Sequence, residues 1–430
     1  MNLPDDKQYE LISIKKNPMY NSMLAAIKII KEFISKRRLI IYGGTAIDYA
    51  LRIHGDQIYS DDMLAIPDLD FYSTDNVKDA YDLAEILYKE GYENARAIRA
   101  LYVRTMRVDI GDNNFLADIT YVPPGIQLPA VRYENMLIIH PDYQRLDLHA
   151  SLSFPLANAP LEAIFSRLSK DISRFNKLDK YYPIGSGFES TGENTPIQMH
   201  KYTIPHEYKK YTFTGLAAYG IICVVLGRKN ATEFTRGFSF LTINDEVEIV
   251  HTDFDMVIKE EKLEDIHYYN KYINILPSMA VGKKGGINVK IHNMAGKRIA
   301  AHTITYREHK LRITNIQYIL MNFLANAYIH DGPIRTTYLE LYKDLISLTT
   351  NPTHEFLLPT YKTYGAENIS EANEISLNKI EIDMGVSGVN LFTMPAIVYH
   401  PKKEGSRPEP FEYTEKFYQI DGSEKVLDKK

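Results

Sequence analysis

The sequence predicts an α+β fold with a mixed sheet, because helical and strand-like patterns alternate along its first part. Residues 20–36 repeat apolar side chains at helical spacing and lead directly into a short apolar strand at 38–42. A second strand at 67–72 precedes another helical pattern at 77–88. The run 101–122 reads as a hairpin, with its turn at Gly-Asp-Asn-Asn. A hairpin combined with strand–helix units places parallel and antiparallel strands in one sheet.

Size and composition narrow the function classes. The chain has 430 residues, of which 45% are hydrophobic and 24% charged, so we expect a large core divided into two or three domains. The net charge of −5 excludes a basic field over the whole protein, and any nucleic-acid contact must come from a local patch. The single cysteine, Cys223, excludes an internal disulfide and a cysteine-based zinc site, which predicts a reducing compartment. We expect no membrane contact, because no apolar run reaches the length of a membrane span and the N-terminus lacks a signal-peptide pattern.

A glycine pair stands between the first strand and the next helical pattern. Gly43 and Gly44 end the strand at 38–42, and Ile47, Ala50 and Leu51 then recur at helical spacing. This order places backbone N–H groups and the positive end of a helix where a phosphate can bind. A glycine pair that only makes a turn is the structural alternative.

Two aspartates begin the second strand. Asp68 and Asp70 are two residues apart and therefore project from the same face of a strand. Neighbouring carboxylates repel unless a cation lies between them, and Mg²⁺ prefers such oxygen ligands together with substrate phosphates. A solvated strand edge is the structural alternative for this pair alone. The combination of a phosphate-binding turn with a metal-binding Asp-x-Asp favours nucleotidyl transfer.

A third carboxylate follows in the returning strand of the hairpin. Asp118 is embedded in the apolar run 116–122, where a carboxylate needs a cationic partner or a metal. A third carboxylate completes many two-metal sites, and Asp109 on the outgoing strand is the competing candidate. We favour Asp118 because it is embedded more deeply. The alternative is a structural ion pair between Asp118 and Arg104 or Arg107.

Four motifs together resemble the catalytic subunit of viral poly(A) polymerases. They are IYGGTA at 41–46, PDLDF at 67–71, ADI at 117–119 and YQRLDLH at 143–149. The similarity covers about residues 38 to 185 and is greatest to the mimivirus-type enzymes of large nucleocytoplasmic DNA viruses, and more distant to the poxvirus large subunit. It implies a polymerase-β-like nucleotidyltransferase fold. The stretch between the glycine pair and the first aspartate is longer than in compact nucleotidyltransferases, because residues 54–66 are inserted as a loop.

The resemblance implies a template-independent enzyme that adds AMP from ATP to the 3′ end of viral mRNA by a two-metal mechanism. Asp68, Asp70 and Asp118 would be the catalytic residues and the ligands of Mg²⁺ or Mn²⁺, and the triphosphate would bind at Gly43 and Gly44. The implied partners are ATP, a single-stranded RNA 3′ end and a second copy of the chain in a homodimer. The implied location is the host cytoplasm, at the viral factory, with the virion as a further site.

Two further nucleotide contacts are candidates. Thr45 either caps the helix after the glycine pair or donates its hydroxyl to a phosphate oxygen. On the predicted helix at 160–179, Arg167, Lys170 and Arg174 recur at helical spacing beside an apolar line. The family carries a basic residue on such a helix to neutralise the triphosphate, and we choose Lys170 for that role; a solvated basic face is the alternative.

Two segments connect these motifs to the rest of the chain. The proline-rich stretch 122–129 is expected to end the sheet and carry the chain to a second layer. If the segment 143–149 is a strand, Arg145, Asp147 and His149 share one face, as a contact near the nucleotide or as an ordinary ion-pair face.

The second half gives weaker signals. A Gly-, Ser- and Thr-rich stretch places a domain boundary near 187, with the catalytic domain at 1–187 and a second α+β domain at 188–430, RNA-binding and related to a degenerate nucleotidyltransferase. Asp253 and Asp255 form a second Asp-x-Asp, which is either a remnant of such a domain or chance. The RNA contacts expected there are a cluster of basic residues, for which a solvated hairpin is the alternative: Lys283, Lys284, Lys290, Lys297 and Arg298.

Two other function classes remain open on these residues. One is a nucleotidyltransferase whose acceptor is a protein or a small molecule instead of RNA. The other is an inactive RNA-binding scaffold that keeps the fold. Metal-dependent turnover separates the enzymes from the scaffold, and the choice of acceptor separates the enzymes from each other.

Overall fold

The computed structural model forms two compact units that do not follow a single cut in the sequence. The first unit comprises residues 1–144, 176–183 and 388–414, and the second comprises 145–175, 184–387 and 415–430. The boundary near 187, and the roles given to its two sides, stay predictions. The structure describes residues 14–59, 66–100, 104–111, 114–122, 124, 128–156, 161–184, 198–202, 211–226, 238–243, 245–269, 279–294, 299–306, 309–330, 332–349, 360–374, 397–403, 407–410, 417–418 and 424–425.

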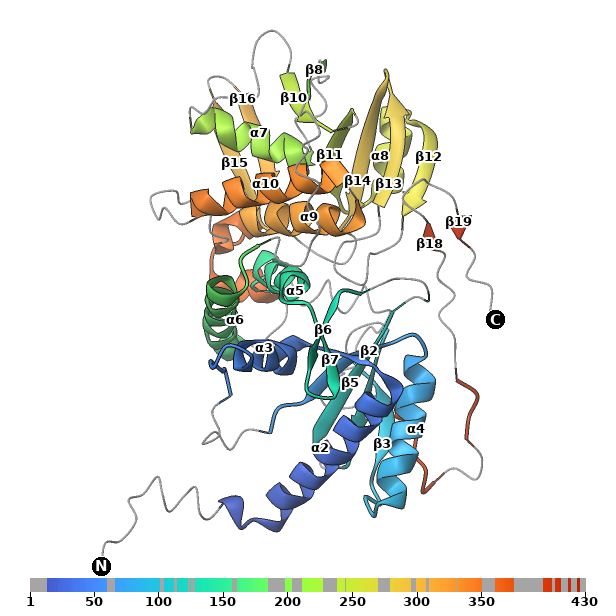
Figure 1. Cartoon of the computed structure of the whole chain (residues 1–430). Coiled ribbons are helices and arrows are strands. Elements are labelled where there is room, and N and C mark those ends of the chain that lie inside the picture. The colour runs from blue at the N-terminus through green and yellow to red at the C-terminus, as the bar shows by residue number, and fades with distance from the viewer. Residues whose placement is uncertain are drawn as a thin grey trace, which may run out of the picture. The chain divides into compact units, whose positions relative to one another are not determined.

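The first unit is built on a mixed eight-stranded sheet, in the order β17-β3-β4-β5-β2-β1-β7-β6 (Figure 1). Strands β2 and β5 are parallel, as are β1 and β7, and the remaining pairs are antiparallel. The elements are α2 (Pro18–Arg37), β1 (Ile40–Tyr42), α3 (Gly43–Arg52), β2 (Leu69–Ser73), α4 (Asn76–Lys89), β3 (Arg96–Arg99), β4 (Thr105–Asp109), β5 (Phe115–Tyr121), β6 (Ala130–Tyr133), β7 (Met136–Ile139) and β17 (Ile397–Tyr399). The predicted α+β class with a mixed sheet is confirmed.

Helices α2 and α4 pack against each other and against the same sheet. The ring of Phe33 on α2 lies 6.5 Å from that of Phe71 on β2, and Phe71 is fully buried. Because strand residues alternate between faces, Asp70 points to the opposite face from Phe71. Gly91 closes α4 with a positive φ of 96°, at the position where the sequence predicts the helix end.

The second unit contains a seven-stranded sheet, in the order β12-β13-β14-β11-β9-β16-β15, with α9 and α10 side by side (Figure 1). Two smaller pairs, β10 with β8 and β18 with β19, complete the described strands. The elements are β8 (Gln198–Tyr202), β9 (Thr212–Phe213), α7 (Gly215–Val225), β10 (Phe238–Thr242), β11 (Glu246–His251), α8 (Phe254–Glu261), β12 (Glu264–Tyr269), β13 (Met279–Lys284), β14 (Ile287–Asn293), β15 (Ala301–Tyr306), β16 (His309–Thr314), α9 (Ile316–Ile329), α10 (Gly332–Thr349), the 3₁₀ helix η3 (Tyr361–Tyr364), β18 (Phe417–Tyr418) and β19 (Glu424–Lys425).

Helices α5 (Pro141–Ser153) and α6 (Leu161–Tyr181) contain residues of both units. The strand interpretation of 143–149 is wrong, because this segment lies inside α5. Arg145 and His149 are therefore one helical turn apart, and both are buried. Whether these residues form an ordinary ion-pair face or contact the nucleotide stays a prediction.

Two further expectations are corrected. The proline-rich stretch after β5 does not end the sheet, because the β6–β7 hairpin that follows belongs to the same eight-stranded sheet. Asp253 is the N-cap of α8, where its side chain accepts a hydrogen bond from the backbone N–H of Met256 at 2.9 Å. Helix capping thus accounts for Asp253, the first aspartate of the second Asp-x-Asp.

The basic cluster of the second half lies partly on a hairpin formed by β13 and β14. Lys283 is exposed, with a side chain 57% accessible beside Asp265. Lys290 is buried and contacts Glu246, so it offers no surface charge to RNA. Lys297 and Arg298 lie outside the described residues. Among the described helices, none combines the length and the apolar character needed to cross a membrane.

His149 predicts a pH dependence of stability. Its Nε2 lies 2.7 Å from the Tyr342 hydroxyl and its Nδ1 2.8 Å from the Gln317 side-chain oxygen, and burial lowers its pKa to about 4. The unfolded chain takes up a proton near pH 6.5, so stability falls as the pH drops from 6.5 towards 4, by roughly 1.4 kcal/mol per pH unit.

We expect His149→Gln to flatten this slope in denaturant titrations at a series of pH values. His267, which is exposed, supplies the matched control, and His267→Gln should leave the slope unchanged. An unchanged slope in His149→Gln would show that burial of this ring does not cause the pH dependence.

Candidate active site

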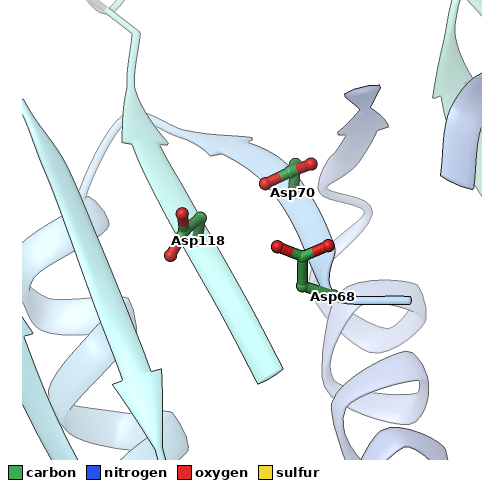
Figure 2. Close-up of side chains that lie close together, drawn as sticks. All are labelled: Asp68, Asp70 and Asp118. Carbon is green, nitrogen blue, oxygen red and sulfur yellow. The ribbon is translucent and has the colours of Figure 1, made fainter. Parts of the chain in front are cut away.

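The three aspartates singled out in the sequence meet at one end of the first sheet. Asp70 on β2 is the direct register partner of Asp118 on the parallel strand β5, and Asp68 immediately precedes β2. Their ligand oxygens lie within 4.8 Å of one another. Figure 2 shows the three side chains close together. Within the described part of the chain, no other group of three acidic, histidine or cysteine side chains lies this close. This donor set suits a hard divalent cation.

Burial differs among the three carboxylates. Asp68 is exposed, Asp70 is half-buried and Asp118 is buried. The cluster is therefore exposed to solvent at Asp68 and enclosed at Asp118. The metal-binding and catalytic roles of these residues stay predictions.

Arg107 on β4 supplies a cation to the cluster. Its Nε and Nη2 donate to the two oxygens of Asp118 at 2.6 and 2.5 Å, forming a bidentate pair. The hydrogen bonds that Arg107 donates to Asp118 raise the pKa of Arg107 against the effect of burial, and the charges of Asp68 and Asp70 add to the rise. The ion pair proposed as an alternative for Asp118 is therefore present, and the same carboxylate also belongs to the acidic cluster.

Asp109, the competing candidate, has a structural role. Arg96 donates to both of its oxygens at 2.8 Å, and the backbone N–H of Gly111 donates to Oδ1 at 3.1 Å. The Asp109 side chain is fully buried and is absent from the acidic cluster. The choice of Asp118 over Asp109 agrees with this geometry.

Gly43 allows the start of α3 to touch the cluster. Its φ is +71°, and a Cβ at this position would lie 2.4 Å from Oδ2 of Asp70. No other residue type fits without moving the carboxylate. The backbone N–H of Gly43 donates to the side chain of Gln144 at 2.9 Å. Gly44 follows in the first helical turn, whose N–H groups have no acceptor within the helix.

Thr45 is hydrogen-bonded to the backbone of Asp68. Its hydroxyl donates to the Asp68 carbonyl oxygen at 3.2 Å. The helix-capping interpretation is wrong, because α3 begins two residues earlier and Tyr42 is its N-cap. A contact between Thr45 and a phosphate stays a prediction.

Hydrogen bonds and an ion pair hold the described part of the inserted loop after α3. Asp48 accepts hydrogen bonds from the backbone N–H groups of Ile58 and Tyr59 at 2.8 and 2.9 Å. Lys177 bonds the carboxylate of Asp56 at 2.7 Å, and this contact lowers the pKa of Asp56 to about 2. Residues 60–65 of the loop lie outside the described part of the chain.

Lys170 lies on an exposed part of α6, as does Arg167, whereas Arg174 lies 3.9 Å from Asp171. Lys170 belongs to the second unit and the acidic cluster to the first. Its contact with a triphosphate stays a prediction.

Sequence reasoning missed one contact of the site and undervalued another. Gln144 lies 101 residues from Gly43, and no local pattern signals that its side chain accepts from that N–H. The sequence predicts Arg107 only as a possible structural ion-pair partner of Asp118. Its position opposite Asp118 in the predicted hairpin was the available signal.

We expect Gly43→Ala to weaken divalent-cation binding at the cluster at least about tenfold, because the added Cβ displaces the Asp70 carboxylate. Gly55→Ala is the matched control, since Gly55 has a φ of +76° with nothing within 4 Å of its Cβ position. Both variants should lose about 1 kcal/mol of stability from backbone strain. Mn²⁺ titration of both variants checks the difference, and equal affinities would rule out the contact with Asp70.

We expect Arg107→Met to lower stability by about 3 kcal/mol in EDTA and by less in Mn²⁺, because the metal then supplies the missing positive charge. Arg96→Met removes the equivalent bidentate pair with Asp109, away from the cluster. It should cost the same stability with and without Mn²⁺. Thermal unfolding of both variants in the two conditions measures this, and parallel losses would show that Arg107 does not balance the cluster's charge.

Comparisons with known proteins bear on the same region. Residues 28–158 match the protein-family model described as "Poly(A) polymerase catalytic subunit". A putative poly(A) polymerase catalytic subunit of African swine fever virus (isolate Tick/Malawi/Lil 20-1/1983) is 40% identical over 227 residues, which are 52% of this chain and 46% of the relative. The counterpart in Acanthamoeba polyphaga mimivirus is 30% identical over 42% of this chain and 31% of its own length. The chain thus aligns with less than half the length of these curated relatives.

One solved structure resembles most of the chain. The crystal structure of the Megavirus polyadenylate synthase aligns with a TM-score of 0.59 and 21% identity, covering 89% of this chain and 74% of that one. This likeness shows a shared fold. Together the comparisons confirm the resemblance seen in the sequence: residues 28–158 match the model of the poly(A) polymerase catalytic subunit, and this part of the chain is similar to the putative catalytic subunits of African swine fever virus and mimivirus.

Proposed function

We propose that this chain is a viral polynucleotide adenylyltransferase that adds AMP from ATP to the 3′ end of mRNA without a template. The observation that carries the proposal is the meeting of Asp68, Asp70 and Asp118 beside a glycine-initiated helix, within residues that match the family model. The carboxylates supply metal ligands, and the helix start supplies N–H groups for the triphosphate.

In the proposed mechanism Asp68, Asp70 and Asp118 would hold two Mg²⁺ or Mn²⁺ ions, which would neutralise the triphosphate and lower the pKa of the RNA 3′-hydroxyl. The Gly43-Gly44 helix start holds the triphosphate, and Lys170 adds positive charge. The 3′ oxygen forms a bond to the α-phosphorus as the bond to the bridging oxygen breaks and pyrophosphate leaves. Thr45 holds the Asp68 backbone, and Arg107 keeps Asp118 oriented towards the cluster.

The second domain, 188–430, is proposed to bind RNA, and two copies of the chain are proposed to form a homodimer. The proposed location is the host cytoplasm at the viral factory, with the virion as a further site. These parts follow from the similarity to the viral relatives and extend it beyond the matched residues.

The test is extension of a labelled single-stranded RNA with Mg²⁺ and each nucleoside triphosphate in turn. We expect a ladder with ATP, reduced at least about a thousandfold in Asp68→Asn/Asp70→Asn because the metal ligands are lost. Asp253→Asn/Asp255→Asn changes the other Asp-x-Asp, where asparagine still caps α8, and should keep the activity.

Other results would favour the other function classes. RNA binding without extension by any nucleotide would favour an inactive scaffold. Labelling of a protein or small molecule from α-labelled ATP, with RNA unchanged, would favour a nucleotidyltransferase with another acceptor.

A further inference from the structure

The second unit repeats the chain path of the first. The elements correspond one to one in their neighbours and directions: β9 to β1, α7 to α3, β11 to β2, β14 to β5, β13 to β4 and β16 to β7. In both sheets the central pair, β2 with β5 and β11 with β14, is parallel, and the strand before the helix is antiparallel to one of them. The two sheets can therefore be compared position by position.

The glycine that begins the helix is repeated too. Gly215 starts α7 with a φ of +57°, after an extended N-cap residue, Thr214. A Cβ on Gly215 would lie 2.7 Å from Oε1 of Glu248, just as one on Gly43 would meet Asp70. Glu248 thus occupies the position of Asp70. The earlier Asp-x-Asp at 253 and 255 is not the equivalent pair.

The register identifies the other two equivalents. Asp70 pairs with Asp118 across β2 and β5, and Glu248 pairs with Lys290 across β11 and β14. Two residues before Glu248 lies Glu246, which corresponds to Asp68. The acidic trio of the first unit therefore corresponds to two glutamates and a lysine in the second.

Lys290 brings a positive charge to both glutamates and contacts Glu246 directly. Its Nζ lies 3.4 Å from Oε2 of Glu246, and its side chain is only 11% exposed. Burial opposes the ionisation of Glu248, but Lys290, the His292 ring at 2.9 Å and the Asn322 amide at 2.7 Å outweigh it and lower its pKa to about 2. Glu248 is therefore charged and already has partners, whereas burial raises the pKa of Glu246 against the opposing effect of the Lys290 charge.

We infer that the ammonium of Lys290 takes the place of the divalent cation in the second unit, so that this unit contains a metal-independent copy of the nucleotidyltransferase site. Of the two equivalent positions, only the one in the first unit is then left for a divalent cation, which rests on the proposed function. The inference rests on the repeated fold and on the charged side chains of Glu246, Glu248 and Lys290. Its test measures metal binding and stability instead of polymerase activity.

Mn²⁺ titration of the full chain tests the number of centres. Asp68→Asn/Asp70→Asn should weaken Mn²⁺ binding at least about a hundredfold, with no other tight site remaining. A tight site that persists in this variant and disappears when Glu246→Gln/Glu248→Gln is added would overturn the inference.

Changing the lysine tests its role directly. In the Asp68→Asn/Asp70→Asn background, Lys290→Asp restores a trio of carboxylates and should produce a Mn²⁺-dependent rise in Tm. Lys283→Asp, at an exposed lysine on the neighbouring strand of the same hairpin, is the control and should produce none. A folded Lys290→Asp chain without such a rise would contradict the inference.

A neutral substitution covers the case in which Lys290→Asp does not fold. Lys290→Met should lower the Tm by roughly 5 °C or more, because it leaves buried carboxylates without their cation. Lys283→Met should change it by less than about 2 °C. Equal effects of the two methionine variants would show that Lys290 is not needed to neutralise Glu246 and Glu248.

Discussion

Repulsion among Asp68, Asp70 and Asp118 is the constraint around which the first unit is built. Two unit charges about 5 Å apart repel by roughly 3 kcal/mol at an effective dielectric constant of about 20. The parallel pairing of β2 with β5 nevertheless places Asp70 beside Asp118. Arg107 on the adjacent strand and the positive end of α3 offset part of this repulsion. The remaining negative charge suits a divalent cation.

The two units share one backbone arrangement but differ in where the positively charged side chain lies. In both, a glycine with positive φ lets a helix start against a carboxylate. In the first unit the cation comes from β4, through Arg107. In the second unit the residue paired with Lys290 on β13 is Val281, and the cation is Lys290 itself. The position of the positive charge therefore separates an open acidic cluster from one that is neutralised internally.

The end of the chain completes the first unit. Strand β17 pairs with the edge strand β3 and covers hydrogen-bonding groups that would otherwise remain exposed. The Tyr399 hydroxyl donates to Glu85 at 2.9 Å, and its ring packs at a tilt against that of Tyr81, with the ring centres 4.9 Å apart. Arg407 forms an ion pair with Asp82, which also binds Arg37. Residues near both ends of the sequence thus stabilise the same sheet and helices.

By itself the sequence determined the local parts of this protein. Helical spacing, the glycine pair and the two-residue spacing of Asp68 and Asp70 are short-range patterns, and they predicted α3, β2 and α4 together with the residues of the acidic cluster. Tertiary structure alone decided what depends on pairing between distant strands. Strand register pairs Asp118 with both Asp70 and Arg107. Only the folded chain shows that Gln144 reaches Gly43 and that 143–149 lies in the helix α5. The repeat of the fold was invisible in the sequence for the same physical reason: backbone pairing preserves topology while side chains change, so a lysine now stands where the first unit has Asp118.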